Sequence, residues 1–175
     1  EMNGFLRIME INVIDNALPG KLADTIESEL LGSWFPWYLS RGIDFENDGR
    51  FQFVHNFYKD TEWTTYNKNI LDPILEKLNP KKILKIKANL TMKSASVEDP
   101  IFHIDVDNST ALTAVYYVNS NDGRTLFKNA DSVECKKNRL VVFPSQIFHT
   151  GLMHTHDIYG GKCVINFNFI PYADI

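Results

Sequence analysis

The feature that most constrains the fold is a long region of alternating apolar and polar residues that begins after Pro80. Within the segment 83–92, leucine, isoleucine and alanine at even positions from 84 to 90 alternate with lysine, asparagine and threonine at odd positions from 85 to 91. Successive side chains of a β-strand point to opposite faces of its sheet, so this pattern predicts a strand with one buried face. Further strands are predicted at 111–118, 139–143 and 163–170, with the turn signal Asn121-Asp122-Gly123 among them.

The residues before Pro80 predict a different kind of structure. Leucine and isoleucine recur at a helical period in 20–31 and 69–78, which predicts two amphipathic helices. Short strands are predicted at 11–14 and 51–58, and the aromatic-rich stretch 34–39 contains a proline typical of an edge or irregular segment. Helices followed by many short strands favour a β-sandwich or barrel supported by N-terminal helices. We therefore predict one domain over 1–175, with helical support at about 15–80 and a core barrel at about 83–170.

Composition excludes several classes of protein. With 175 residues, of which 44% are apolar, the chain is long enough to bury a core. No apolar run approaches the roughly 20 residues that a membrane-spanning helix needs. The net charge of −4 gives no electrostatic reason to expect binding to nucleic acid or to an anionic membrane. We expect a soluble cytoplasmic protein in which Cys135 and Cys163 stay reduced.

The triplet His103-Ile104-Asp105 is the best candidate for a metal site. On a strand, alternation would send His103 and Asp105 to the same face, where a nitrogen and an oxygen can bind one cation. His149, after the apolar run 140–143, is the candidate third ligand. Two histidines and one carboxylate leave open metal positions, as in non-haem Fe(II) oxygenases. Taken alone, the triplet is more often a solvent-exposed end of a strand.

The other histidines compete less well for this role. His154 and His156 are also two residues apart, but they lie in a polar turn and are expected to be solvated. His55 lies in an apolar strand-like segment, where a structural histidine is expected.

Several motifs follow one another in a fixed order along the chain. They are His103-x-Asp105, Tyr116-Tyr117-Val118-Asn119, Asp122-Gly123, the run 138–143, His149, and Gly161-Lys162 before the alternating run 164–169. This order resembles the catalytic core of prolyl-4-hydroxylase-like 2-oxoglutarate oxygenases, in particular the short members found in bacteria and their phages. The resemblance covers residues 83–170, half of the chain. For a phage-encoded protein, the expected location is the host cytoplasm.

The resemblance implies a mainly β fold with N-terminal helices and a double-stranded β-helix, the cupin-like jelly-roll barrel. It implies that His103, Asp105 and His149 bind iron. It also implies that Lys162 pairs with the distal carboxylate of 2-oxoglutarate and that Tyr117 assists there.

Three more residues are candidates for the same cavity. Asn89 and Thr91 lie on the polar face of the strand predicted at 83–92, and the family often has a tyrosine at the position of Thr91. Asn166 shares a face with Lys162 in the last predicted strand. Without the resemblance this face would be expected to be exposed to water; facing the barrel interior, a lysine and an asparagine need polar partners.

The resemblance further implies Fe(II), 2-oxoglutarate and O2, with ascorbate as an optional reductant, and hydroxylation of a C–H bond with release of succinate and CO2. Asp105 favours hydroxylation, because related halogenases leave that position free for a halide. A prolyl residue in a protein or peptide is the favoured substrate, followed by a free amino acid or another small molecule. The segments 34–38 and 44–50 are candidates for a lid or substrate groove, with plain packing as the alternative.

Two readings from other classes stay open. The first is a non-catalytic β-barrel that binds a metal or a 2-oxo acid, although structural zinc prefers four protein ligands and Lys162 would have no role. The second is a cupin-type isomerase or dioxygenase, which would ordinarily need more histidine ligands.

Overall fold

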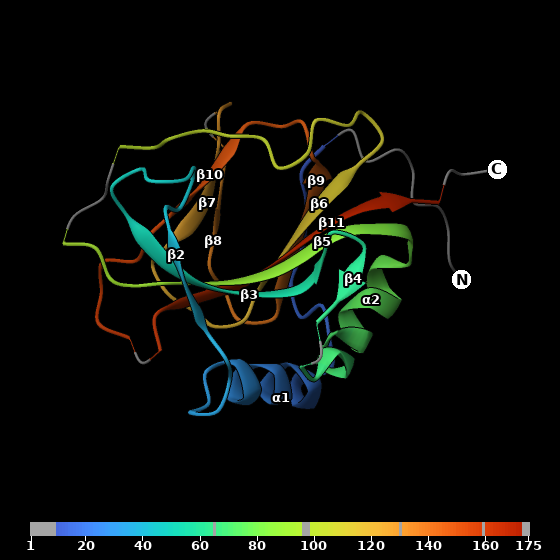
Figure 1. The fold of residues 1–175 in the computed structure, drawn as a ribbon, viewed down its shortest axis with the longest axis horizontal. Helices are drawn as coiled ribbons and strands as arrows, with labels where there is room; N and C mark the ends of the chain where they lie inside the picture. The colour runs from blue at the N-terminus through green and yellow to red at the C-terminus, as the bar shows by residue number, and fades with distance from the viewer. Residues whose placement is uncertain (1–9, 65, 96–98, 130, 159, 173–175) are drawn as a thin grey trace.

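The computed structural model describes residues 10–64, 66–95, 99–129, 131–158 and 160–172, which form two antiparallel sheets (Figure 1). Within these residues the larger sheet has eight strands. Seven follow in the order β1 (Asn12–Ile14), β9 (Arg139–Pro144), β6 (Leu112–Tyr117), β11 (Lys162–Pro171), β5 (Pro80–Thr91), β3 (Phe51–Lys59) and β2 (Tyr38–Arg41), and β4 (Glu62–Trp63) pairs with β3. The smaller sheet has the described strands β10 (His149–Leu152), β7 (Arg124–Phe127) and β8 (Ser132–Glu134) in that order.

Helices pack against one face of the larger sheet. Helix α1 (Gly20–Leu30) buries Ala23, Ile26 and Leu30, and α2 (Asp72–Leu78) buries Ile74 and Leu78. A short 3-10 helix, η1 (Lys68–Leu71), leads into α2, which ends at Asn79 in a left-handed conformation with φ of 44°. None of the described helices is long and apolar enough to cross a membrane.

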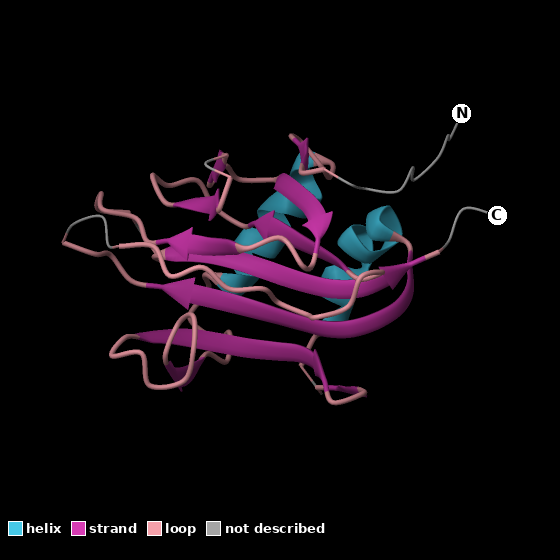
Figure 2. Ribbon diagram, turned by 90° about the horizontal axis from the view of Figure 1, so that it is seen from above, coloured by secondary structure: helices cyan, strands magenta, loops and turns pink. Residues whose placement is uncertain are grey.

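The predicted alternation places two central strands correctly. On β5, Ile86 and Ala88 are buried in the core on the helix side. On β11, the core side chains are those at odd positions from Cys163 to Phe169. The polar residues at the intervening positions face the other way and line a pocket. Figure 2, seen from above, shows the long strands of the larger sheet lying side by side.

The second face of the larger sheet packs against the smaller sheet. Phe127 of β7 contacts Phe143 of β9 edge to face, with ring centroids 5.0 Å apart. Val133 and Cys135 join this second core cluster, together with Tyr117 of β6. The two sheets therefore enclose a space between them, and the pocket lined by residues of both sheets lies in this space.

The structure confirms the two predicted helices and the strands at 11–14, 51–58, 83–92, 111–118, 139–143 and 163–170 to within a few residues. The short strands β4, β7, β8 and β10 were not predicted, because segments of two to four residues carry little periodicity. The predicted helical region at about 15–80 also supplies β2 and β3 to the larger sheet. Cys135 and Cys163 are both buried and free.

Candidate metal centre

Backbone hydrogen bonds place the two candidate histidine ligands beside each other. His103 and His149 form an isolated antiparallel bridge, in which each backbone N–H donates to the carbonyl of the other at 3.0 Å. The two imidazole centroids lie 4.8 Å apart. The predicted strand at His103-Ile104-Asp105 is reduced to this single bridge, so the pairing with β10, rather than a continuous strand, brings the residues together.

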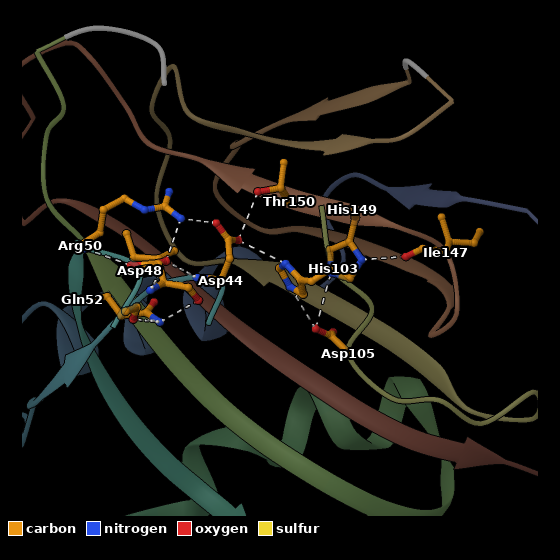
Figure 3. A network of polar contacts seen from close by, with 11 residues as sticks. Asp44, Asp48, Arg50, Gln52, His103, Asp105, Ile147, His149 and Thr150 are labelled. Atoms are coloured by element: carbon orange, nitrogen blue, oxygen red, sulfur yellow. Dashed lines mark hydrogen bonds and ion pairs between the residues drawn. The ribbon is translucent and has the colours of Figure 1, made fainter. Parts of the chain in front are cut away.

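Three ligand atoms converge on one point (Figure 3). Oδ1 of Asp105 lies 3.5 Å from Nε2 of His103 and 3.6 Å from Nε2 of His149. One ligand atom from each of the three residues lies within 4.8 Å of the other two. This set of two imidazole nitrogens and one carboxylate oxygen suits a divalent transition metal and leaves coordination positions for other ligands.

The second oxygen of Asp105 is held by the larger sheet. Oδ2 accepts hydrogen bonds from Asn168 Nδ2 at 3.1 Å and from Thr113 Oγ1 at 3.2 Å. Thr113 itself lies 2.9 Å from the hydroxyl of Ser145. These bonds fix the carboxylate so that Oδ1 is the oxygen facing the histidines.

The outer nitrogen of each histidine also has a partner. Nδ1 of His149 lies 2.9 Å from the carbonyl oxygen of Ile147, which favours the tautomer with the proton on Nδ1. Nδ1 of His103 lies 3.2 Å from Oδ1 of Asp44, an ion-pair contact that does not have hydrogen-bond geometry. Such partners leave Nε2 of each ring for the metal.

Electrostatics at this site are those of a cation site. Burial would lower the pKa of His103, but contacts with Asp105 and Asp44 outweigh it and raise the pKa to about 9. Burial would raise the pKa of Asp105, but the two histidines and Asn168 hold it well below its usual value. The two carboxylates thus favour positive charge at this site, which a bound divalent metal would supply.

Asp44 belongs to the turn between β2 and β3, which Asp48 holds in shape. Oδ2 of Asp48 accepts hydrogen bonds from the backbone N–H groups of Ile43 and Asp44, both at 3.0 Å. Arg50 forms ion pairs with both aspartates. Thr150 donates a further hydrogen bond to Asp44 at 3.3 Å. The predicted lid or groove segment 44–50 thus contacts the candidate metal centre directly.

A pocket extends from the three ligands between the two sheets. Its floor combines the polar rows of two neighbouring strands, which pair in the register Lys162 with Thr91 and Asn166 with Lys87. The wall facing this floor includes Thr125 and Gly151 of the smaller sheet. The lining residues from the polar rows are Lys85, Lys87, Asn89, Thr91, Lys162, Asn166 and Asn168.

Lys162 lies at the start of β11 with only 6% of its surface exposed. Its Nζ donates to the carbonyl oxygens of Leu152 at 2.8 Å and Arg124 at 3.3 Å. An ammonium group has three N–H donors, so one is left for a ligand. Burial lowers the pKa of Lys162, and no carboxylate in the described part of the chain forms an ion pair with it. Space for its side chain requires Gly123, where a Cβ would lie 3.0 Å from Cδ of Lys162.

Two other candidates carry polar atoms without a hydrogen-bond partner among the described residues. They are Oδ1 of Asn89 and Oγ1 of Thr91, both buried and both from residues that line the pocket. Buried polar atoms without partners are uncommon in folded proteins, and in a pocket they indicate a ligand. Asn166 also lines the pocket and is half-buried.

Tyr117 lies behind the pocket wall. Its hydroxyl is 2.6 Å from Oγ1 of Thr125, and the described lining of the pocket includes Thr125 but not Tyr117. Thr125 therefore presents its hydroxyl on the pocket wall, and Tyr117 contacts it from the second core cluster.

The remaining histidines lie away from the three ligands. His55 is buried, and its Nδ1 lies 2.9 Å from the carbonyl oxygen of Pro36, as expected for a structural histidine. His156 is exposed, as predicted. The expectation that His154 is solvated is wrong, because it is 2% exposed and its carbonyl accepts a hydrogen bond from the backbone N–H of Ser94.

Asp44, Asn168 and Thr113 have roles that the sequence analysis did not assign. The signal for Asn168 is the alternation of the last strand, which puts it on the same face as Lys162 and Asn166. Asp44 gave no such signal, because it lies in a turn and 59 positions before His103.

The fold is a double-stranded β-helix, the fold of the 2-oxoglutarate/Fe(II) oxygenases. Among similar solved structures is a prolyl-4-hydroxylase from Pseudomonas putida, with a TM-score of 0.60, 14% identity and 95% of each chain covered. A second is the non-haem, alpha-ketoglutarate-dependent epimerase SnoN of nogalamycin biosynthesis, with a TM-score of 0.64 and 11% identity, covering 94% of this chain and 80% of SnoN.

A third similar structure is a viral collagen prolyl hydroxylase from Paramecium bursaria Chlorella virus-1. Its TM-score is 0.55 at 13% identity, with 99% of this chain and 96% of that chain covered. SnoN has also been solved with Fe3+ and alpha-ketoglutarate bound. No family model matches the sequence, and no curated protein is significantly similar to it. At these identities the likeness establishes the fold.

Proposed function

We propose that this protein is a non-haem Fe(II)- and 2-oxoglutarate-dependent dioxygenase that hydroxylates a C–H bond and releases succinate and CO2. The observation that carries this proposal is the convergence of Nε2 of His103, Nε2 of His149 and Oδ1 of Asp105 on a pocket that also contains Lys162. A double-stranded β-helix shared with oxygenases of this class supports it. Domain 1–175 would then be a single catalytic unit.

The residues fit both proposed groups. His103, Asp105 and His149 would hold Fe(II), and Lys162 would hold the distal carboxylate of 2-oxoglutarate through its remaining N–H. When bound, iron and 2-oxoglutarate supply the activation of O2 and the oxidation of the C–H bond. Ascorbate would keep the metal reduced.

The chain's own side chains orient these groups. Asn168 and Thr113 fix the carboxylate of Asp105, and Asp44 fixes the ring of His103. Thr125, supported by Tyr117, lies on the pocket wall and offers a hydroxyl.

Asn89, Thr91 and Asn166 provide further polar groups to a bound co-substrate. Thr91, whose Oγ1 has no hydrogen-bond partner among the described residues, pairs in register with Lys162. Thr91 therefore lies at the end of the pocket where the distal carboxylate of 2-oxoglutarate is expected. Oδ1 of Asn89 can accept a hydrogen bond from an ordered water or from the substrate.

A prolyl residue in a protein or peptide is the favoured substrate, with a free amino acid or another small molecule as the second candidate. Two of the similar structures are prolyl hydroxylases, and SnoN is an epimerase of a small-molecule pathway. Both kinds of substrate therefore occur on this fold.

A non-catalytic barrel that binds a metal or a 2-oxo acid is the competing function. Anaerobic addition of Fe(II) and then 2-oxoglutarate separates binding from chemistry, because chelation by a 2-oxo acid gives a charge-transfer absorption band. We expect the band in the wild type, its loss in Asp105→Ala, and a weaker affinity for 2-oxoglutarate in Lys162→Met, by about ten- to a hundredfold.

Admission of O2 tests the activity. We expect succinate to form, and mass spectrometry of proline-containing peptides and of free amino acids to show a gain of one oxygen. A band without succinate would favour the non-catalytic barrel. Absence of both the band and succinate in correctly folded protein would refute the proposed function.

A further inference from the structure

Besides Lys162, two further lysines line the pocket. Lys85 and Lys87 lie on the polar face of β5, and neither forms an ion pair within the described part of the chain. Burial lowers the pKa of Lys87 to about 8, and repulsion from Lys85 and Lys59 adds to this effect. Asp105 is the carboxylate that favours the charged form of Lys87. A partly buried cation of this kind is normally compensated by an anion.

The charges of the proposed cofactors leave this pair uncompensated. A divalent metal carries two positive charges, of which Asp105 neutralises one. The two carboxylates of 2-oxoglutarate neutralise the other and the charge of Lys162. The other carboxylate of the chain that lines the pocket, Asp44, is already in contact with Arg50 and His103. Lys85 and Lys87 then face a site with no net negative charge, and metal binding also removes the attraction of Asp105 for Lys87.

The spacing along the strands separates the pair from Lys162. In the register between β11 and β5, Lys162 pairs with Thr91, whereas Lys87 pairs with Asn166, four residues further along β11. At about 3.3 Å per residue, the two backbone positions are about 13 Å apart. A five-carbon diacid spans about 5 Å between its end carbons, given C–C bonds of about 1.5 Å. The backbone carbonyls of Leu152 and Arg124 also hold Nζ of Lys162 at the smaller sheet.

We propose that Lys87 and Lys85 form a second anion subsite, which binds a carboxylate or phosphate group of the substrate beside the metal centre. Asn166 lies opposite Lys87 in register and half-buried on the pocket floor, so within this inference its amide N–H donors serve the substrate anion rather than the co-substrate. The inference rests on the proposed function, because it assigns 2-oxoglutarate to Lys162. It restricts the substrate to a molecule with an anionic group close to the oxidised carbon.

Anion binding can be measured without turnover. The diamagnetic ion Zn(II) replaces Fe(II), and 2-oxoglutarate is added to saturation so that it occupies the end of the pocket at Lys162. NMR then follows the ε-methylene signals of ¹³C-labelled lysine. Inorganic phosphate and acetate are titrated separately, so that the two kinds of anion are distinguished. We expect saturable shifts of the Lys87 and Lys85 signals with at least one of the two anions, each signal being assigned by its loss in Lys87→Gln or Lys85→Gln.

The matched control is Lys82, an exposed residue of the same strand. Its signal should shift without saturation, and Lys82→Gln should leave the shifts of Lys87 unchanged. Absence of a saturable shift at Lys87 with either anion would overturn the proposal. The Fe(II)/2-oxoglutarate absorption band reports separately on the proposed function, so the two failures are distinguishable.

A substrate screen with matched pairs gives the second test. Each pair differs only in charge: N-acetylproline with its amide, and Asp-Pro peptides with Asn-Pro peptides. We expect the acid of a pair to gain one oxygen and the matching amide to gain none. Reaction of N-acetylproline would identify a small acid as the substrate, and reaction of an Asp-Pro peptide would identify a peptide. For the reacting acid, Lys87→Gln should lower kcat/KM about ten- to a hundredfold, while KM for 2-oxoglutarate stays unchanged. Equal oxidation of acid and amide, or an unaffected Lys87→Gln, would refute the proposal.

Discussion

Replacing Lys87 by methionine should make the ligand-free protein more stable at neutral pH. The pKa of Lys87 lies near 8 in the folded protein and at 10.5 in an unfolded chain. At about 1.4 kcal/mol per pH unit, keeping the charge in the folded state costs about 3 kcal/mol. Methionine retains most of the apolar stem and carries no charge. We therefore expect the free energy of unfolding at pH 7 to rise by about 2 to 3 kcal/mol in Lys87→Met.

The pH dependence gives the sharper form of this prediction. Between pH 8 and 10.5 the unfolded wild type keeps the proton of Lys87 while the folded protein has lost it, so wild-type stability rises with pH in this window. The advantage of Lys87→Met should therefore be full below pH 8 and vanish near pH 10.5. Urea unfolding at pH 7 and pH 10.5, without metal or 2-oxoglutarate, measures both values. Lys82→Met, on the exposed part of the strand, should change stability by less than about 0.5 kcal/mol.

A destabilised Lys87→Met at pH 7, or a difference from wild type that does not shrink with pH, would refute the reasoning. The first result would mean that the ammonium group has a stabilising partner in the folded state. The second would mean that the effect comes from packing rather than from charge. The same variant should lose affinity for an anionic substrate, so stability and binding would change in opposite directions.

Three further predictions concern other parts of the molecule. Asp44→Asn should weaken Fe(II) binding by about ten- to a hundredfold, as measured by metal titration, because His103 loses its charged partner; unchanged affinity would contradict this role. Asn138 bonds the backbone of Leu18 through both side-chain atoms and has a φ of 62°, so Asn138→Ala should cost about 2 to 4 kcal/mol in urea unfolding. Asn138→Gly should cost about 1 kcal/mol less than Asn138→Ala, because glycine tolerates this φ. Phe167→Ala should lower the free energy of unfolding by about 3 to 5 kcal/mol, because the side chain is 1% exposed in the main core; a loss below 1 kcal/mol would contradict that packing.

Much of the fold could be predicted because its long strands carry a regular alternation. From 85 to 91 on β5 and from 162 to 169 on β11, this alternation assigned the side chains to the core or to the pocket, whereas at the start of β5 Ile83 rather than Leu84 packs against the core. The three candidate ligands were identified by their residue types and by the order of the motifs along the chain. The polar face of β11 alone is more typical of a face exposed to water, and the family resemblance identified Lys162 as a buried lysine with an anionic partner.

Features that depend on loops could not be predicted in the same way. Asp44 reaches His103 because Asp48 folds the turn after β2, and no periodic pattern encodes such a contact. The burial of His154 depends on a backbone bond to Ser94, 60 positions earlier in the chain. The contact of the Tyr117 hydroxyl with Thr125 could not be predicted either, because Thr125 belongs to the short strand β7, which carries too little periodicity to be recognised.

The shared register of β5 and β11 limits how this protein can change. Even positions from 162 to 168 on β11 serve the pocket, and the odd positions between them build the core. Deleting one residue within the strand would exchange the two roles, placing Phe167 among the polar groups and Asn166 against the helices. Insertions are therefore tolerable only outside these strands. The turn 42–50 borders the pocket without belonging to the core, so new substrate preferences can arise there while the two central strands keep their length.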